Sequence, residues 1–273
     1  WRNNGSDILS TGRAYPRAKD SYFKESVTWS FISSAYFGVR YSDKGFVFDM
    51  AGCSAFPSAE KLMFLTGLLC SSTSYYFLKF MNPTLNFQVG NVSQIPLPAC
   101  NELEVSQIAR SAIKLSRIDW DRFEVSWDFS KHELLNSETS ATTLPLSWEK
   151  TSQIVDSRVL TLKTLEETNN RIFIDAYGLE DDVLPEVPEN QITLSRSNRV
   201  HDCERLISYA IGCMMGRYSL DEPGLIYAHA GNVGFEPIQY TRFPADADGI
   251  VPNERLLSER NAMNLTAKRE AAR

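Results

Sequence analysis

The sequence lacks the glycine-rich loops that bind nucleotides, because it contains no GxGxxG, GxxxxGKS or GxxxxGKT pattern. Such loops hold phosphate groups with backbone amides at the start of a helix. No serine lies in a GxSxG elbow, the strand-to-helix turn that exposes a nucleophile in many hydrolases. These absences exclude the common nucleotide-binding and hydrolase motifs. We therefore predict no catalytic residue and no bound cofactor in this chain.

Histidine and paired cysteine are also scarce. His132, His201 and His229 lie in ordinary polar or mixed contexts, and the five cysteines are widely spaced without a CxxC pair. His201 and Cys203 are two residues apart, but zinc sites need a second pair of ligands. Asp202, between them, is typical of a helix cap or an acidic first turn. We predict no metal site, and the odd number of thiols fits a reduced, cytoplasmic protein.

An excess of positive charge is missing from the chain as a whole. The formal net charge is −6, which argues against a basic surface spread over the molecule. Residues 1–100 nevertheless carry nine Lys and Arg against six Asp and Glu, a net +3, and residues 101–273 carry 19 against 28, a net −9. If the chain contacts nucleic acid, we expect its first third to do so.

An uninterrupted apolar run is absent too. The segment LMFLTGLLCSSTSYYFLKFM, residues 62–81, is long enough for a bilayer, but Ser71–Ser74 interrupt it and Lys79 lies inside it. We expect a buried helix, broken in two, and no membrane partner. No signal peptide is recognised, and the first residue is Trp1, which suggests a fragment of a longer protein.

The first third of the chain predicts a small sheet. Between residues 21 and 49, ESVTWSFISS, YFGVRY and GFVFDM are rich in β-branched and aromatic residues and are separated by turn-forming SSA and SDKG. Trp29 lies in an alternating strand, which favours a core position. Residues 59–80 read as helix. FQVGNVSQIPLP, residues 87–98, reads as a strand followed by an extended exit, where two prolines forbid helix.

Helical patterns dominate the remainder. Residues 101–119 have apolar spacing near 3.6 with Asn101 as a cap, and a long helix is expected to end at Gly178. Val155, Leu162 and Asn169 recur every seven residues within it, and CERLISYAIGCMMGRYSL, residues 203–220, predicts a further helix. The fold class is α+β: a small antiparallel or mixed sheet domain with packed helices in residues 1–145, then a mainly helical region with a loop-rich end in residues 146–273.

The segment NPTLNFQVGN, residues 82–91, begins like the catalytic loop of a DNA amino-methyltransferase. That loop reads Asn or Asp, Pro, Pro, aromatic, and its aromatic ring stacks on a flipped base. Thr84 and Leu85 replace the second proline and the aromatic, and Leu85 offers no flat face to a base. The sequence favours a turn joining a helix to a strand.

A succession of long segments resembles a known family. FKESVTWSFIS, GFVFDMAGCSAFPS, MNPTLNFQVGNVSQIPLP, DWDRFEVSWDF, NNRIFIDAYGLEDDVLPEVPENQITL, RLISYAIGCMMGRYSLDEPGLIYA and FPADADGIVP occur in this order. Together they resemble the C-terminal half of the PglX family of adenine-specific DNA methyltransferases, from BREX phage-defence systems. The resemblance covers roughly Trp1 to Pro252. The tail after Pro252 departs from the family pattern.

The resemblance implies a function for this part of such a protein. The cofactor motif for S-adenosylmethionine and the catalytic loop would lie in an upstream methyltransferase domain. Residues 1–145 would be a target-recognition domain for double-stranded DNA, and residues 146–273 a helical C-terminal region. This chain by itself is then expected to lack methyltransferase activity, and residues 82–91 would be scaffold.

Basic residues of the first third are the candidates for DNA contact. Phosphates need Arg or Lys, whereas base edges need side chains held by a rigid element. Arg13, Arg17 and Lys19 surround Pro16 in a flexible-looking stretch and suit phosphates, and Arg40 lies on an expected strand and suits a base edge. The candidate DNA-binding residues are Arg13, Arg17, Lys19, Lys24, Arg40 and Lys44.

A second function remains open from sequence. The acidic helical half, with its net −9, would instead dock onto other proteins of a defence complex, and DNA contact would be incidental. The two roles are compatible if different parts of the chain carry them.

Overall fold

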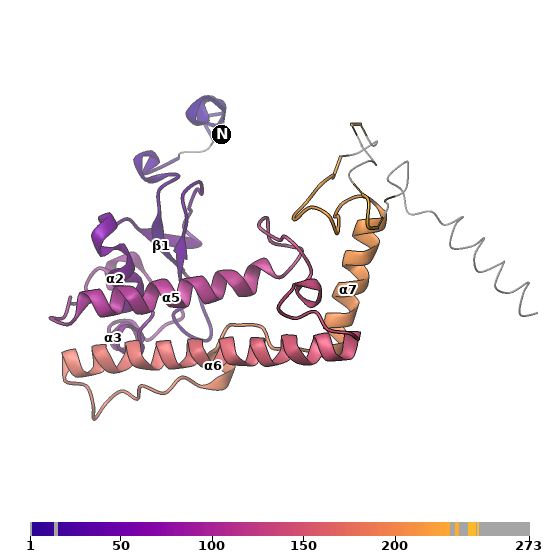
Figure 1. Cartoon of the computed structure of the whole chain (residues 1–273). Helices are drawn as coiled ribbons and strands as arrows, with labels where there is room; N and C mark the ends of the chain where they lie inside the picture. The colour runs from indigo at the N-terminus through magenta and orange to yellow at the C-terminus, as the bar shows by residue number, and fades with distance from the viewer. Residues whose placement is uncertain (1, 14–15, 230–232, 235–239, 244, 246–273) are drawn as a thin grey trace, which may run out of the picture. The chain divides into compact units, whose positions relative to one another are not determined.

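A computed structural model of the chain describes residues 2–13, 16–229, 233–234, 240–243 and 245 (Figure 1). The chain divides into two compact units, each made of separate segments. The first unit comprises residues 1–115 and 160–193, and the second unit comprises residues 116–159 and 194–273. The boundaries of these units differ from the predicted boundary at residue 145. The division into a recognition domain, residues 1–145, and a helical region, residues 146–273, stays a prediction. The tail after Pro252 lies outside the described residues.

The first unit contains a three-stranded antiparallel sheet. Strands β1 (Ser26–Ser30), β2 (Val39–Ser42) and β3 (Gly52–Ala55) lie in the order β2-β1-β3. Helices make up most of the regular structure that follows, so the α+β prediction is confirmed.

Two predicted strands are wrong in place. GFVFDM, residues 45–50, is not a strand, because the Asp49 carboxylate accepts hydrogen bonds from the amides of Ala51 and Gly52, and β3 begins only after this turn. In FQVGNVSQIPLP, only a single bridge between Ile32 and Asn86 forms next to the segment, and a short helix, α4 (Val89–Val92), replaces the strand.

Helices α2 (Ala59–Leu69) and α3 (Ser72–Met81) confirm the expected broken helix. Ser71 produces the break, since its Oγ donates to the Leu68 carbonyl at 2.6 Å and accepts from the Ser74 amide at 3.3 Å, which caps α3. The apolar segment thus forms two helices, both of which contribute residues to the core. None of the helices in the described part of the chain is long and apolar enough to cross a membrane.

The core of the first unit joins the sheet to these helices. Val27 and Trp29 of β1 are buried with Phe64 and Leu68 of α2, and Phe173 is also fully buried. The Trp29 indole N–H donates to the Phe87 carbonyl at 2.9 Å, so its one polar atom is satisfied. The prediction that Trp29 is a core residue is confirmed.

Helices α5 (Glu102–Asp121) and α6 (Leu144–Tyr177) each contribute to both units. The Asn101 side chain accepts from the Glu104 amide at 3.3 Å, as expected for a cap, and Gly178 ends α6 with a φ of 67°. The heptad positions of α6 are buried, among them Asn169, whose amide donates to the Gly67 carbonyl at 2.8 Å.

The second unit contains α7 (Arg199–Met214) and the short 3-10 helix η3 (Glu133–Leu135). Its small core is aromatic, with Phe129, Tyr209 and Tyr218 around Cys213. Asn198 caps α7, and Asp202 is the predicted acid of its first turn. The remaining short elements are η1 (Arg2–Gly5), α1 (Ser6–Ser10), η2 (Lys19–Ser21) and η4 (Glu189–Gln191).

Candidate nucleic-acid interface

The sheet of the first unit has two chemically different faces. The register pairs Trp29 with Val39 and Cys53, which places apolar side chains on the core face. Successive residues of a strand point to opposite faces, so the remaining positions share the other face. Apart from one glycine and one arginine, that outer face carries hydroxyl side chains only: Ser26, Thr28, Ser30, Arg40, Ser42, Gly52 and Ser54.

Arg40 lies on the edge strand β2 and belongs to this outer face. It is exposed and pairs with Thr28, which in turn pairs with Ser54 on the far strand. Thr28 is fixed by donating its hydroxyl to the Cys53 carbonyl at 2.9 Å. Among the described residues, Arg40 has neither a side-chain hydrogen bond nor an ion pair. A rigid strand therefore presents an uncompensated guanidinium beside short side chains, which cannot block its approach to a ligand.

Lys24 and Lys44 lie at one end of the paired strands. The Phe23 amide donates to the Phe46 carbonyl at 2.8 Å, and the Gly45 amide donates to the Phe23 carbonyl at 3.1 Å. These bonds bring the chain before β1 next to the turn after β2, and both lysines are exposed there. The two hydrogen bonds of the Phe23 backbone also account for the φ of 64° at Phe23, which is unusual for a residue with a side chain.

Acidic side chains moderate the charge at this end of the sheet. The Tyr41 hydroxyl donates to the Glu25 carboxylate at 2.8 Å. Burial, helped by this bond and by Asp43, raises the pKa of Tyr41 above its ordinary value. Lys24 and Lys44 are thus each next to a carboxylate in the sequence, Glu25 and Asp43, whereas Arg40 has no acidic partner among the described residues.

The remaining basic candidates precede the sheet in the chain. Arg13 follows α1 and is exposed, Arg17 is exposed in an irregular stretch, and Lys19 begins η2 with partial exposure. The structure thus brings Arg40, Lys24 and Lys44 to one sheet, whereas the other three lie on the segment that leads into it. The Tyr22 ring, 5.3 Å from that of Phe48, ties the end of this segment to the loop after β2.

The hydroxyl residues around Arg40 were not predicted from the sequence. A signal existed in SVTWS, where Ser26, Thr28 and Ser30 alternate with apolar residues. The register that sets Ser42 and Ser54 on the same face could not be read, because it depends on which strands pair and in what alignment.

Asn82, the residue that resembles a catalytic asparagine, has its amide engaged within its own loop. Its Nδ2 donates to the Asn86 carbonyl at 3.1 Å, and its Oδ1 accepts from the Thr84 hydroxyl at 2.8 Å. A catalytic amide must leave these atoms to the target base. The geometry agrees with the interpretation of this loop as scaffold.

His132 is the one buried histidine of the described chain. Its Nδ1 accepts from the Leu134 amide at 3.3 Å, and burial, with a contribution from Arg205, lowers its pKa to about 4. It is a neutral structural residue. No group of three or more possible metal ligands occurs in the described part of the chain.

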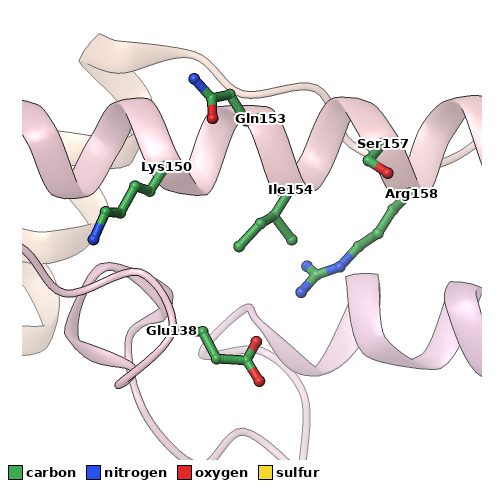
Figure 2. A pocket seen from close by; sticks show the side chains of 6 residues that line it. All are labelled: Glu138, Lys150, Gln153, Ile154, Ser157 and Arg158. Carbon is green, nitrogen blue, oxygen red and sulfur yellow. The ribbon is translucent and has the colours of Figure 1, made fainter.

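The second unit has an open cleft of about 430 Å³ beside the first half of α6 (Figure 2). Its two cations already have partners: Lys150 donates to the Ser140 carbonyl at 3.3 Å, and Arg158 donates to Glu133 at 2.6 Å. None of the predicted DNA-binding residues lines it, and its walls are Glu138, Lys150, Gln153, Ile154, Ser157 and Arg158.

Comparison with known proteins confirms the family resemblance. No protein-family model matches the chain. The chain is 37% identical over 262 residues to the adenine-specific methyltransferase PglX of Lacticaseibacillus casei (strain Zhang). It is 35% identical over 274 residues to the adenine-specific methyltransferase BrxX of Escherichia coli O9:H4 (strain HS). Each match covers 92% of this chain but 22% of the relative, so the chain spans about a fifth of the length of these curated relatives.

Proposed function

We propose that this chain is the DNA target-recognition and interaction region of an adenine-specific DNA methyltransferase of a BREX phage-defence system. The match to PglX and BrxX supports the class of parent protein. The observation that carries the assignment to DNA is the outer face of the sheet, where unpaired Arg40 lies among hydroxyl side chains.

Arg40 has the chemistry of a base reader. A guanidinium can donate two parallel hydrogen bonds to the O6 and N7 acceptors of a guanine in the major groove. A strand holds the Arg40 backbone more firmly than a loop would. The neighbouring Thr28 and Ser54 hydroxyls donate their protons to the Cys53 and Gly52 carbonyls, so they can accept hydrogen bonds from a ligand. This surface can therefore position a duplex and read a base within it.

The other cations of the first unit suit the phosphate backbone. Residues 1–44 carry seven Lys and Arg and four Asp and Glu, which leaves a net +3. Phosphate contacts supply affinity without sequence information. Arg13, Arg17 and Lys19 lie in an irregular segment and Lys24 and Lys44 lie beside the acids at the end of the sheet, so we assign all five to phosphates rather than bases.

In this proposal, the rest of the parent protein catalyses the reaction. S-adenosylmethionine and the methyl transfer would be handled by an upstream methyltransferase domain, and the recognition region would complete the DNA cleft. The alternative role, docking onto other defence proteins, is favoured by the acidic balance of residues 101–273. Both roles fit a cytoplasmic protein that acts on intracellular DNA.

The test uses the full-length parent methyltransferase with the target duplex and an unrelated duplex. We expect Arg40→Ala to weaken binding to the target by about 1–3 kcal/mol and to change binding to the unrelated duplex little. Arg40→Lys keeps the charge but loses the paired donors, so it should retain non-specific binding only. Arg110→Ala, which removes an exposed arginine of α5 in the same unit, is the matched control.

Salt titrations separate phosphate binding from base reading. Replacing Arg13, Arg17 or Lys19 with alanine should weaken binding to both duplexes equally and lower the salt slope by about one for each phosphate-binding cation removed. An equal loss on both duplexes for Arg40→Ala would show that Arg40 does not read a base. If all four substitutions leave binding unchanged, the surface is an ordinary solvated face and the docking role replaces the DNA role.

A further inference from the structure

Three exposed apolar side chains occur in one short stretch of the second unit, whereas the residues assigned to DNA belong to the first unit. Trp127 is 91% exposed, Val125 is 70% exposed and Trp120 is 57% exposed. Large apolar side chains that gather in one exposed surface are typical of an interaction site. Trp120 belongs to the last turn of α5, and the other two residues follow within the next seven positions.

Successive turns hold this stretch in one conformation. The amides of Phe123, Ser126 and Phe129 donate to the carbonyls of the residues three positions earlier, at 3.1, 2.9 and 3.4 Å. The Ser126 hydroxyl also donates to Asp121 at 2.7 Å, and the Asp128 amide donates to the Ser126 Oγ at 3.1 Å. These turns hold the backbone that carries all three exposed side chains in one compact stretch.

Neighbouring side chains of the second unit also hold this stretch in place. The guanidinium carbons of Arg122 and Arg205 lie 5.1 Å and 4.7 Å from the centre of the Phe123 ring. Phe129 packs edge-on against Tyr209 and Tyr218 in the aromatic core of the second unit. Thus the phenylalanines of the stretch are held inside the unit while its tryptophans remain outside. Because the loop is already held in one conformation, a partner that covers these tryptophans loses little free energy in ordering it.

The charge around the patch identifies the partner. Residues 119–128 contain four acids, Asp119, Asp121, Glu124 and Asp128. Against them stand Arg122 and, from α7, Arg205 over the Phe123 ring, which leaves a net −2. Phosphates would be repelled by this field, so the patch is unsuited to DNA. A twofold contact between two copies of the chain would place the same acidic patch against itself. A cationic protein segment meets neither obstacle, and Arg or Lys side chains lie favourably on indole rings.

We propose that Trp120, Val125 and Trp127 form a docking surface for a positively charged segment of a protein partner. The tryptophans supply the anchoring contacts, in keeping with the high share of binding energy that tryptophan carries at interfaces. The acids around them select cationic partners and exclude anionic ones. This proposal does not depend on DNA recognition by the first unit.

The probe is a short synthetic peptide in which Arg and Leu alternate, titrated into the whole chain by calorimetry. We expect Trp127→Ala to weaken its binding about fivefold or more, because truncation of an anchoring tryptophan typically has an effect of this size. Phe80→Ala, which removes an aromatic that is 85% exposed in the first unit, is the matched control and should leave the affinity unchanged. Near-ultraviolet circular dichroism checks that both variants are folded.

Asp128→Asn tests the role of charge without removing an aromatic. It should weaken the Arg-Leu peptide about two- to threefold at low salt, and a peptide alternating Glu and Leu should not bind. Equal binding of the two peptides, or an unchanged affinity in Trp127→Ala, would overturn the proposal. Binding of duplex DNA that is abolished by Trp127→Ala, or self-association in sedimentation that is abolished by it, would also overturn it in favour of DNA or a second copy.

Discussion

The first unit is stabilised by an apolar core, whereas the second unit buries ion pairs beside a small aromatic core. In the first unit, Val27, Leu68 and Phe173 are almost fully buried between sheet and helices. In the second unit, Glu133 is buried between Arg122 at 3.2 Å and Arg158 at 2.6 Å. Burying an ion pair gains little net stability, but removing one partner leaves a charge without compensation. The two units should therefore respond differently to loss of charge and to pH.

The largest difference is expected at Glu133. Glu133→Ala would leave the Arg122 side chain, which is 7% exposed, without this carboxylate partner, so the second unit should lose about 3–5 kcal/mol of stability. Hydrogen exchange of peptides from α7 and from β1 measures the opening of each unit separately. The control is Glu102→Ala, which removes the exposed ion pair with Lys61 and should cost less than about 1 kcal/mol. A similar small loss at Glu133 would contradict the comparison.

The two units should also show opposite responses to pH. The pKa of His132 in the folded protein, about 4, lies below its ordinary value of 6.5. Its contribution to the stability of the second unit is therefore complete above pH 6.5 and is lost as pH falls toward 4. Burial, and to a smaller extent the charge of Glu167, raises the pKa of Glu166 from 4.5 to about 7. Its contribution to the stability of the first unit is therefore complete below pH 4.5 and is lost as pH rises toward 7.

Each of these pH effects should amount to about 2–3 kcal/mol. Besides burial, the charges of Arg205, Asp202 and Arg122 act on the pKa of His132. Because its Nδ1 also accepts a hydrogen bond from the Leu134 amide, the replacement residue must be able to accept that bond. His132→Gln should remove the acid-side loss, and Glu166→Gln should remove the loss at rising pH. Hydrogen exchange at several pH values checks both, and a Glu166→Gln variant with an unchanged pH profile would contradict the second effect.

A smaller effect is expected at Gly67, which lies against Val105 and Asn169 in the first unit. A Cβ at Gly67 would lie 2.5 Å from Val105 Cγ1 and 3.0 Å from Asn169 Oδ1. Gly67→Ala should thus destabilise the first unit by about 1–3 kcal/mol through overpacking. Urea unfolding measures the loss, and Gly90→Ala, whose Cβ would meet nothing within 4 Å, is the matched control.

A double substitution sharpens this last test. Val105→Ala removes the atom that the new methyl group would meet, so the loss in Gly67→Ala with Val105→Ala should be smaller than the sum of the two single losses. Strict additivity would mean that the Val105 contact is not the source of the strain.

Local sequence patterns were sufficient to predict the class of the fold and most of its helices. Helix boundaries follow from local chemistry: Asn101 caps α5, Ser71 separates α2 from α3, and Gly178 ends α6 because glycine accepts a positive φ. The buried position of Trp29 followed from alternation along one strand. Each of these features depends on residues a few positions apart, so it can be read without knowing what packs against it.

Strand pairing, and with it the set of side chains that share a surface, emerged only in the folded molecule. The start of β3 after the Asp49 turn, the outer-face row of Thr28, Arg40 and Ser54, and the burial of Glu133 between two arginines were all absent from the sequence-based predictions. A shift of one residue in strand register would move Arg40 to the core face. The candidate site therefore depends on long-range alignment, which the periodicity of any single segment leaves undetermined.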